Sequence, residues 1–278
     1  MKLALRHPNH PDDVMLYTTE DLRKHFLIET VFAPDEINLT YSLLDRIILG
    51  GIMPKSETLF LKGGKDFGGE LFFEKREGAL LNIGGRGRVQ IDGVKFEMDS
   101  FEGLYIGRGI NDISFSGYDK NKPPKFYVAS APAHHYYPTT LIPQETVKQL
   151  HLGARETSNK RVINQFVHPD VVKSCQLVMG MTELDQGCAW NTMPAHVHSR
   201  RMESYFYFNM EEDTRVFHIM GEAKETRHIV VANEQAVLSP SWSLHCGCGT
   251  GRYSYIWVTC GENTDFTDME PIAMGDLR

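Results

Sequence analysis

Three histidines and one glutamate have the residue types and spacing needed to hold a metal ion. His196 and His198 lie two positions apart, Glu203 follows five residues later, and His245 comes about forty residues further on. Because residues i and i+2 of a β-strand face the same side, the first two imidazoles can converge. Imidazole nitrogens with one carboxylate oxygen suit zinc, iron, manganese, nickel or copper, and suit calcium or magnesium poorly.

A His-x-His pair alone is weak evidence, because two histidines on a strand often simply face the solvent. Here the carboxylate of Glu203 leads into an aromatic segment at residues 205–208, and His245 follows Pro240 at the start of another expected strand. The order His-x-His-x4-Glu, a β-rich gap and Pro-x4-His is typical of the metal site of a cupin barrel. We therefore predict metal binding by all four residues.

The elements that would position these ligands read mostly as β-strands. Short runs that alternate apolar and polar residues, bounded by glycine, occur at residues 87–93, 113–116 and 253–258. Asp92-Gly93 is a good hairpin turn, because glycine tolerates positive φ. Two short helices are expected, one at residues 18–26 with an N-terminal cap and one at 143–150 that begins with proline. Many short strands with regular turns favour a sandwich or a barrel.

The two halves of the chain look like versions of one unit. Arg76–Glu77 leads into an apolar strand as Met202–Glu203 does, but no His-x-His precedes Glu77. We therefore predict an all-β bicupin of two β-sandwich or jelly-roll barrels with a few short helices. Residues 1–145 would form a degenerate N-terminal barrel without a metal site, and residues 146–278 would form the barrel that holds the metal.

Composition narrows the class of protein. The chain has 278 residues, 41% of them hydrophobic and 23% charged, which fits an ordinary globular protein. A net charge of -7 argues against non-specific nucleic-acid binding, which depends on clustered lysine and arginine. No segment has the length of a signal peptide or a membrane span, and five cysteines, an odd number, are no disulfide framework. We expect reduced thiols and a cytoplasmic protein, with no membrane partner.

Longer motifs resemble a known family. The second half carries His196-x-His198-x-Arg-Arg-Met-Glu203, and both halves contain further matching segments. These segments are residues 45–54, 76–77, 82–85, 131–134, 175–184, 190–194, 205–209, 225–228, 233–237, 239–245 and 276–278. Together they resemble the 5-keto-4-deoxyuronate isomerase family, also called the 4-deoxy-L-threo-5-hexosulose-uronate ketol-isomerases, over nearly the whole chain.

This resemblance implies a bicupin fold with one zinc ion per subunit, held by His196, His198, Glu203 and His245; iron, manganese and nickel suit the same donors. It implies a cytoplasmic, homo-oligomeric enzyme, a hexamer or another trimer-based assembly, of pectin-derived uronate breakdown. The small-molecule substrate would be 5-dehydro-4-deoxy-D-glucuronate, and the product would be 3-deoxy-D-glycero-2,5-hexodiulosonate.

Such an isomerisation involves no net redox change and needs no nicotinamide or flavin. It can pass through an enediol or a hydride shift, and the sequence does not choose between them. An enediol route needs a base. Glu203 is a poor base while it binds metal, and Tyr205 and Tyr207 are the other candidates. An arginine is expected to bind the substrate carboxylate, because a guanidinium matches a carboxylate with two parallel hydrogen bonds. Four are candidates, with Arg201 and Arg161 preferred over Arg200 and Arg227.

Three other functions fit the same pattern. A sister isomerase acts on 5-deoxyglucuronate in inositol breakdown and has the same fold and the same kind of metal site. A metal-dependent cupin dioxygenase would use iron and oxygen at a histidine-rich site. A non-catalytic bicupin that binds sugar or serves as a storage protein would not need its metal for ligand binding.

Overall fold

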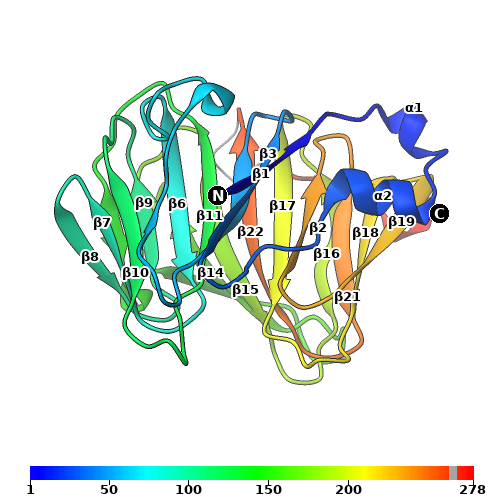
Figure 1. The fold of residues 1–278 in the computed structure, drawn as a ribbon. Helices are drawn as coiled ribbons and strands as arrows, with labels where there is room; N and C mark the ends of the chain where they lie inside the picture. The colour runs from blue at the N-terminus through cyan, green and yellow to red at the C-terminus, as the bar shows by residue number, and fades with distance from the viewer. Residues whose placement is uncertain (263–267) are drawn as a thin grey trace. The chain divides into compact units, whose positions relative to one another are not determined.

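A computed structural model describes residues 1–262 and 268–278. Strands dominate this part of the chain, and its α-helices are short: α1 (Pro11–Val14) and α2 (Thr19–Phe26) (Figure 1). The predicted all-β class with few short helices is confirmed. None of the described helices is long and apolar enough to cross a membrane.

Contacts divide the chain into two compact units. The first comprises residues 1–6, 30–147 and 166–178, and the second comprises residues 7–29, 148–165 and 179–278. The predicted domains, 1–145 and 146–278, were continuous, whereas these units exchange the segments 7–29 and 166–178. The domain boundary itself stays a prediction.

The first unit holds a seven-stranded sheet in the order β1-β3-β4-β11-β6-β9-β12 and a four-stranded sheet in the order β5-β10-β7-β8. The larger sheet consists of β1 (Lys2–Arg6), β3 (Glu36–Ser42), β4 (Ile48–Met53), β6 (Arg76–Asn82), β9 (Gly103–Ile106), β11 (Phe126–Pro132) and β12 (Thr140–Ile142). The smaller consists of β5 (Leu59–Phe60), β7 (Gly87–Ile91), β8 (Val94–Met98) and β10 (Ile113–Gly117). Aliphatic and phenylalanine side chains from both sheets form its core.

The second unit repeats this arrangement. Its sheets run β13-β14-β15-β22-β17-β20-β2 and β19-β18-β21-β16-β23. The larger consists of β2 (Leu27–Ile28), β13 (Lys148–Leu152), β14 (Arg161–Val167), β15 (Val178–Leu184), β17 (Arg201–Phe208), β20 (Gln235–Ser239) and β22 (Ser254–Gly261). The smaller consists of β16 (Trp190–Val197), β18 (Val216–Glu222), β19 (Glu225–Val231), β21 (His245–Gly249) and β23 (Glu270–Pro271). The order β4-β11-β6-β9 matches β15-β22-β17-β20, as expected of a duplicated barrel.

Two short sequence patterns, a hairpin turn and a helix cap, predicted the local structure correctly. Asp92 and Gly93 have φ of 46° and 84°, and they join β7 to β8 in a two-residue turn beside the Ile91–Val94 pair. Positive φ at both central residues is the requirement of a type I′ hairpin. Thr18 caps α2 in a capping box with Asp21, so the helix begins where the sequence predicts.

The helix predicted at residues 143–150 is wrong. A 3-10 turn at Gln144–Thr146 is followed by strand β13, which pairs with β14 from Lys148↔Gln165 to Leu152↔Arg161. A proline at the start of a helix and at the start of a turn gives the same local signal. Pairing with a strand more than ten residues further along decided the outcome, and no local pattern encodes that contact.

Glu77 on β6 is a fully buried carboxylate of the first unit. One oxygen accepts from the backbone N–H of Gln176 at 2.7 Å and of Leu177 at 2.9 Å. The other accepts from the N–H of Cys175 at 2.7 Å and from the Tyr105 hydroxyl at 2.8 Å. Burial and the nearby Glu77 charge raise the pKa of Tyr105, so this hydroxyl keeps its proton and donates. Four donors therefore compensate one buried negative charge.

Replacing Glu77 with glutamine should destabilise the protein by about 2–4 kcal/mol, because an amide NH₂ would face N–H donors and leave buried groups unpaired. Chemical or thermal unfolding measures the effect. Exposed Glu145→Gln is the matched control and should change stability by less than about 0.5 kcal/mol. Unfolding of the Glu77→Gln protein at the wild-type midpoint would contradict this account.

Candidate metal centre

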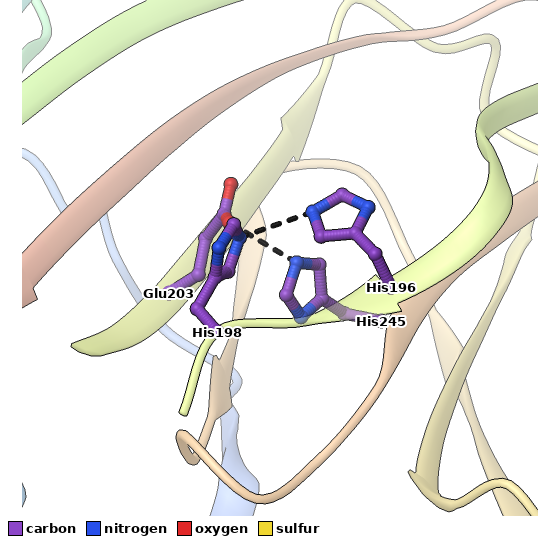
Figure 2. Close-up of side chains that lie close together, drawn as sticks. All are labelled: His196, His198, Glu203 and His245. Carbon is purple, nitrogen blue, oxygen red and sulfur yellow. Dashed lines mark hydrogen bonds and ion pairs between the residues drawn. The ribbon is translucent and has the colours of Figure 1, made fainter. Parts of the chain in front are cut away.

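Three neighbouring side chains and one from about forty residues further along the chain converge in the second unit. His196 comes from β16, His198 from the turn that follows it, Glu203 from β17 and His245 from β21. Their ligand atoms all lie within 4.8 Å of one another, and Figure 2 shows the rings and the carboxylate pointing toward one region. The predicted ligand set is therefore brought together by the fold.

Strand pairing explains this convergence. His196 and His245 are direct partners in the β16–β21 ladder, so their side chains share a face. The register of this ladder shifts between Asn191 and His196, because β16 carries extra residues there. A bulge of this kind re-aims side chains near functional sites. Within the bulge, Thr192 adopts φ of 54°, which is uncommon for a β-branched residue.

The distances fit a small cation. Nε2 of His198 lies 3.0 Å from Nε2 of His196 and 2.9 Å from Oε2 of Glu203. Nε2 of His245 lies 3.1 Å from the same Glu203 oxygen. Four ligand atoms about 2.1 Å from one tetrahedral ion lie roughly 3.4 Å apart. These three separations are somewhat shorter than that spacing, and all four ligand atoms lie within 4.8 Å of one another, so the cluster is compact enough to surround one ion.

His245 gives the strongest sign that a cation belongs here. It is 1% exposed; Nδ1 has no hydrogen-bond partner among the described residues, and the contact of Nε2 is the ion pair with Glu203 at 3.1 Å. A buried polar group without a partner is costly, whereas metal coordination would satisfy its lone pair. The donor set and this buried, incompletely paired imidazole together fit a metal such as zinc, iron, manganese or nickel.

Electrostatics prepare the donors for binding. Burial, followed by the charge of His245, lowers the pKa of His196 to about 3, so this imidazole is neutral with a free lone pair near pH 7. Burial opposes ionisation of Glu203. The charge of His245 and the hydrogen bond with His198 outweigh that penalty and hold the pKa of Glu203 well below its ordinary value. The carboxylate is therefore negative, as a metal ligand must be.

The cluster opens into a cavity of about 410 Å³. Its wall is mostly apolar and includes Leu150, Ile163, Met193, Pro194, Trp257 and Met269. Among the described residues that line it, Arg161 is the single arginine or lysine. The polar groups beside the cluster come from Gln165, Thr182, Thr192, Tyr205 and Tyr255. A small anionic molecule could thus reach the cluster within a largely dry pocket.

The family model described as the KduI/IolB family matches residues 29–272. The chain belongs to the KduI/IolB family. Two curated relatives of this family member carry the name 4-deoxy-L-threo-5-hexosulose-uronate ketol-isomerase. The relative from Enterococcus faecalis, whose name carries the number 2, is 49% identical over 273 residues, 98% of this chain and 99% of the relative. That of Lachnoclostridium phytofermentans is 51% identical over 276 residues, 99% of this chain and 100% of the relative.

Solved structures agree on the fold of this KduI/IolB member. An IolB-like protein of Salmonella typhimurium LT2 has a TM-score of 0.72 at 14% identity, and the match covers 89% of this chain and 97% of that one. Oxalate decarboxylase of Lactobacillus farciminis has a TM-score of 0.56 at 10% identity over 81% and 79% of the two chains. The predicted bicupin fold is confirmed.

The two candidate tyrosines differ in their surroundings. Tyr205 lines the cavity, and its hydroxyl lies 3.0 Å from that of Thr192. Tyr207 is two residues further along β17, and its hydroxyl meets Nδ1 of His218 at 2.8 Å instead of lining the cavity. Burial raises the pKa of both hydroxyls well above the ordinary value. Tyr205 is therefore the one placed to meet a bound molecule, as a protonated donor.

The four candidate arginines also separate. Arg161 lines the cavity, whereas Arg200 is exposed and pairs with Glu262. Arg227 pairs with Glu225 on β19 and does not line the cavity. The preference for Arg201 does not fit its position, because it is 1% exposed and bound by Asp268. From the sequence, an arginine inside the ligand motif looks free to bind a substrate. In the structure, Arg201 at the start of β17 is buried and paired with Asp268.

Arg201 and Asp268 instead support His198. Arg201 donates to both carboxylate oxygens of Asp268 at 2.8 and 2.9 Å and to Thr259 at 2.8 Å. The Asp268 carboxylate lies 3.7 Å from Nδ1 of His198, and Arg201 Nη2 lies 3.2 Å from that nitrogen. A guanidinium N–H can only donate, so Nδ1 of His198 accepts in this contact, and the Asp268 carboxylate holds the guanidinium in place beside the ring. Asp268 was missed in the sequence because nothing local links it to a ligand about 70 residues earlier.

Replacing Asp268 with asparagine should weaken metal binding roughly 10- to 100-fold, because Arg201, which contacts the ring of His198, loses the carboxylate that holds it in place. It should also lower stability by about 3 kcal/mol, because Arg201 is left buried without its counter-charge. Competition with a chelator measures the first effect and thermal unfolding the second. Glu262→Gln, which removes the exposed partner of Arg200, is the control and should change neither. Wild-type metal affinity in the Asp268→Asn protein would rule out this role.

Proposed function

We propose that the protein is a metal-assisted ketol-isomerase that converts 5-dehydro-4-deoxy-D-glucuronate into 3-deoxy-D-glycero-2,5-hexodiulosonate in uronate breakdown. The observation that carries this proposal is the three-histidine, one-carboxylate cluster at the end of a cavity whose single described cationic side chain is Arg161. It occurs in a chain about half identical, over its full length, to relatives named for this reaction. We also propose that the enzyme is cytoplasmic and homo-oligomeric.

Zinc is the metal we propose, held by His196, His198, Glu203 and His245. A bound divalent cation would polarise the substrate carbonyl and lower the pKa of the adjacent hydroxyl. Within the protein, the His196–His245 strand pair and the buried Arg201–Asp268 pair keep the donors in place. The apolar wall limits the access of water to the reacting carbons. This chemistry needs no redox cofactor, because no electrons leave the substrate.

Two further side chains bind and orient the substrate in this proposal. Arg161 pairs with the substrate carboxylate, because a guanidinium offers two parallel donors that match it. Tyr205 keeps its proton at neutral pH, since its pKa is raised first by burial and then by the charge of Glu203. Its Oη–H would turn from Thr192, whose own proton is donated to Asn191, to a substrate oxygen. The base of an enediol route and the choice between that route and a hydride shift stay open.

Removing the metal tests the centre of this proposal. Chelator-treated protein should lose at least 100-fold in turnover and regain it with zinc, and His245→Ala should lose both bound metal and turnover. Elemental analysis and a ketol-isomerisation assay measure the two quantities. His228→Ala, an exposed histidine on β19, is the control. Full activity of metal-depleted protein would refute the proposal. Turnover of 5-deoxyglucuronate alone would favour the sister isomerase, and oxygen uptake with bound iron would favour a dioxygenase.

Replacing Arg161 with methionine tests substrate binding separately. KM should rise at least about tenfold while bound metal stays unchanged, because a charge-assisted hydrogen bond worth roughly 1.5–3 kcal/mol is lost. Steady-state kinetics at fixed metal content measure this change. Arg200→Met is the matched control, since Arg200 is exposed and lies outside the cavity. An unchanged KM in the Arg161→Met protein would remove this residue from the site.

A further inference from the structure

Gln165 is a buried amide in the wall of the cavity. It lies on β14, where Arg161, Ile163 and Gln165 all line the cavity. Their spacing of two residues places them on one face of the strand. Gln165 is only 2% exposed. It is therefore enclosed by protein while it still borders the space that a substrate would enter.

Its carbonyl oxygen is unsatisfied. Oε1 of Gln165 has no hydrogen-bond partner among the described residues. The neighbouring amide on the opposite face of β14, that of Asn164, is fully used: Gln149 donates to its oxygen at 2.8 Å, and its own nitrogen donates to Glu183 at 3.1 Å. Buried polar groups are almost always paired, and an exception calls for an explanation. In a cavity wall, the missing partner can arrive with the ligand.

The chemistry of this unpaired amide oxygen indicates which kind of group it would bind. A neutral amide oxygen accepts a hydrogen bond from a hydroxyl and adds no charge that would repel a carboxylate. Arg161, four residues earlier on the same face, lies about 13 Å away along the strand backbone. Its long side chain can shorten that separation at the charged end. The face of β14 thus presents one group for a carboxylate and one for a hydroxyl.

We propose that Gln165 is a specificity-determining residue, which accepts a hydrogen bond from a hydroxyl of the open-chain sugar acid while Arg161 binds its carboxylate. This inference rests on the proposed function. It adds that a residue of β14, Gln165, recognises a hydroxyl group of the substrate. A site built to bond a hydroxyl discriminates strongly against a molecule that lacks it, because the buried acceptor would then stay unpaired. The metal cluster does not provide this selection, since it addresses the carbonyl and its neighbouring oxygen.

The decisive experiment compares Gln165→Leu with Gln149→Leu in the metal-loaded protein. Leucine removes the acceptor and keeps a side chain of similar size. For Gln165→Leu, kcat/KM on 5-dehydro-4-deoxy-D-glucuronate should fall about 5- to 30-fold with metal content unchanged. The melting temperature should stay the same or rise, because a buried unpaired group has been removed. Gln149 lies on the neighbouring strand outside the cavity, and its variant should keep wild-type kcat/KM.

The outcomes separate this inference from the proposed function. A wild-type protein that fails to isomerise the substrate would overturn the proposed function before any variant is measured. With an active wild type, a Gln165→Leu protein with kcat/KM within twofold of wild type would overturn the role of Gln165 alone. A fall in melting temperature together with loss of metal would also overturn it, because the amide would then be structural. A selective fall in kcat/KM at unchanged metal content and stability supports it.

Discussion

The structure depends on the compensation of a buried carboxylate on an interior strand of each larger sheet. An ionised carboxyl group taken out of water is too costly to keep unless other groups satisfy it. In the second unit, Glu203 on β17 meets the imidazoles of His198 and His245, and a cation among them would complete the balance. In the first unit, Glu77 on β6 meets backbone N–H groups and the Tyr105 hydroxyl instead.

This comparison explains how the first unit can hold a buried carboxylate that hydrogen-bond donors of the protein satisfy. Glu77 is opposite Ala131 of β11, and Glu203 is opposite Thr259 of β22, so the two carboxylates occupy matching positions in matching strand orders. The segment around Cys175–Leu177 supplies to Glu77 what histidines supply to Glu203. A buried carboxylate thus stands at this position in both units, and among the described residues it is Glu203 that faces other side chains able to bind a metal.

The sequence predicted the parts of the site that short-range patterns encode. The ligand spacing, the turn at Asp92-Gly93 and the helix cap at Thr18 are local, and each was found. Strand β13 was mistaken for a helix because its identity depends on pairing with β14. Arg201 was taken for a substrate ligand because its partner, Asp268, arrives from a distant part of the chain. Long-range contacts decide whether a polar side chain supports a site or faces its cavity.

The same reasoning assigns different tasks to residues of similar chemistry. Arg161 lines the cavity into which the cluster opens, whereas Arg201 is held in an ion pair with the largely buried carboxylate of Asp268. Asn164 and Gln165 are adjacent amides, yet the first is paired on both sides and the oxygen of the second is not. A strand alternates its faces at every residue, so one step along β14 separates a structural amide from one open to a ligand. Unpaired polar atoms in a cavity wall therefore identify binding groups that residue type alone does not reveal.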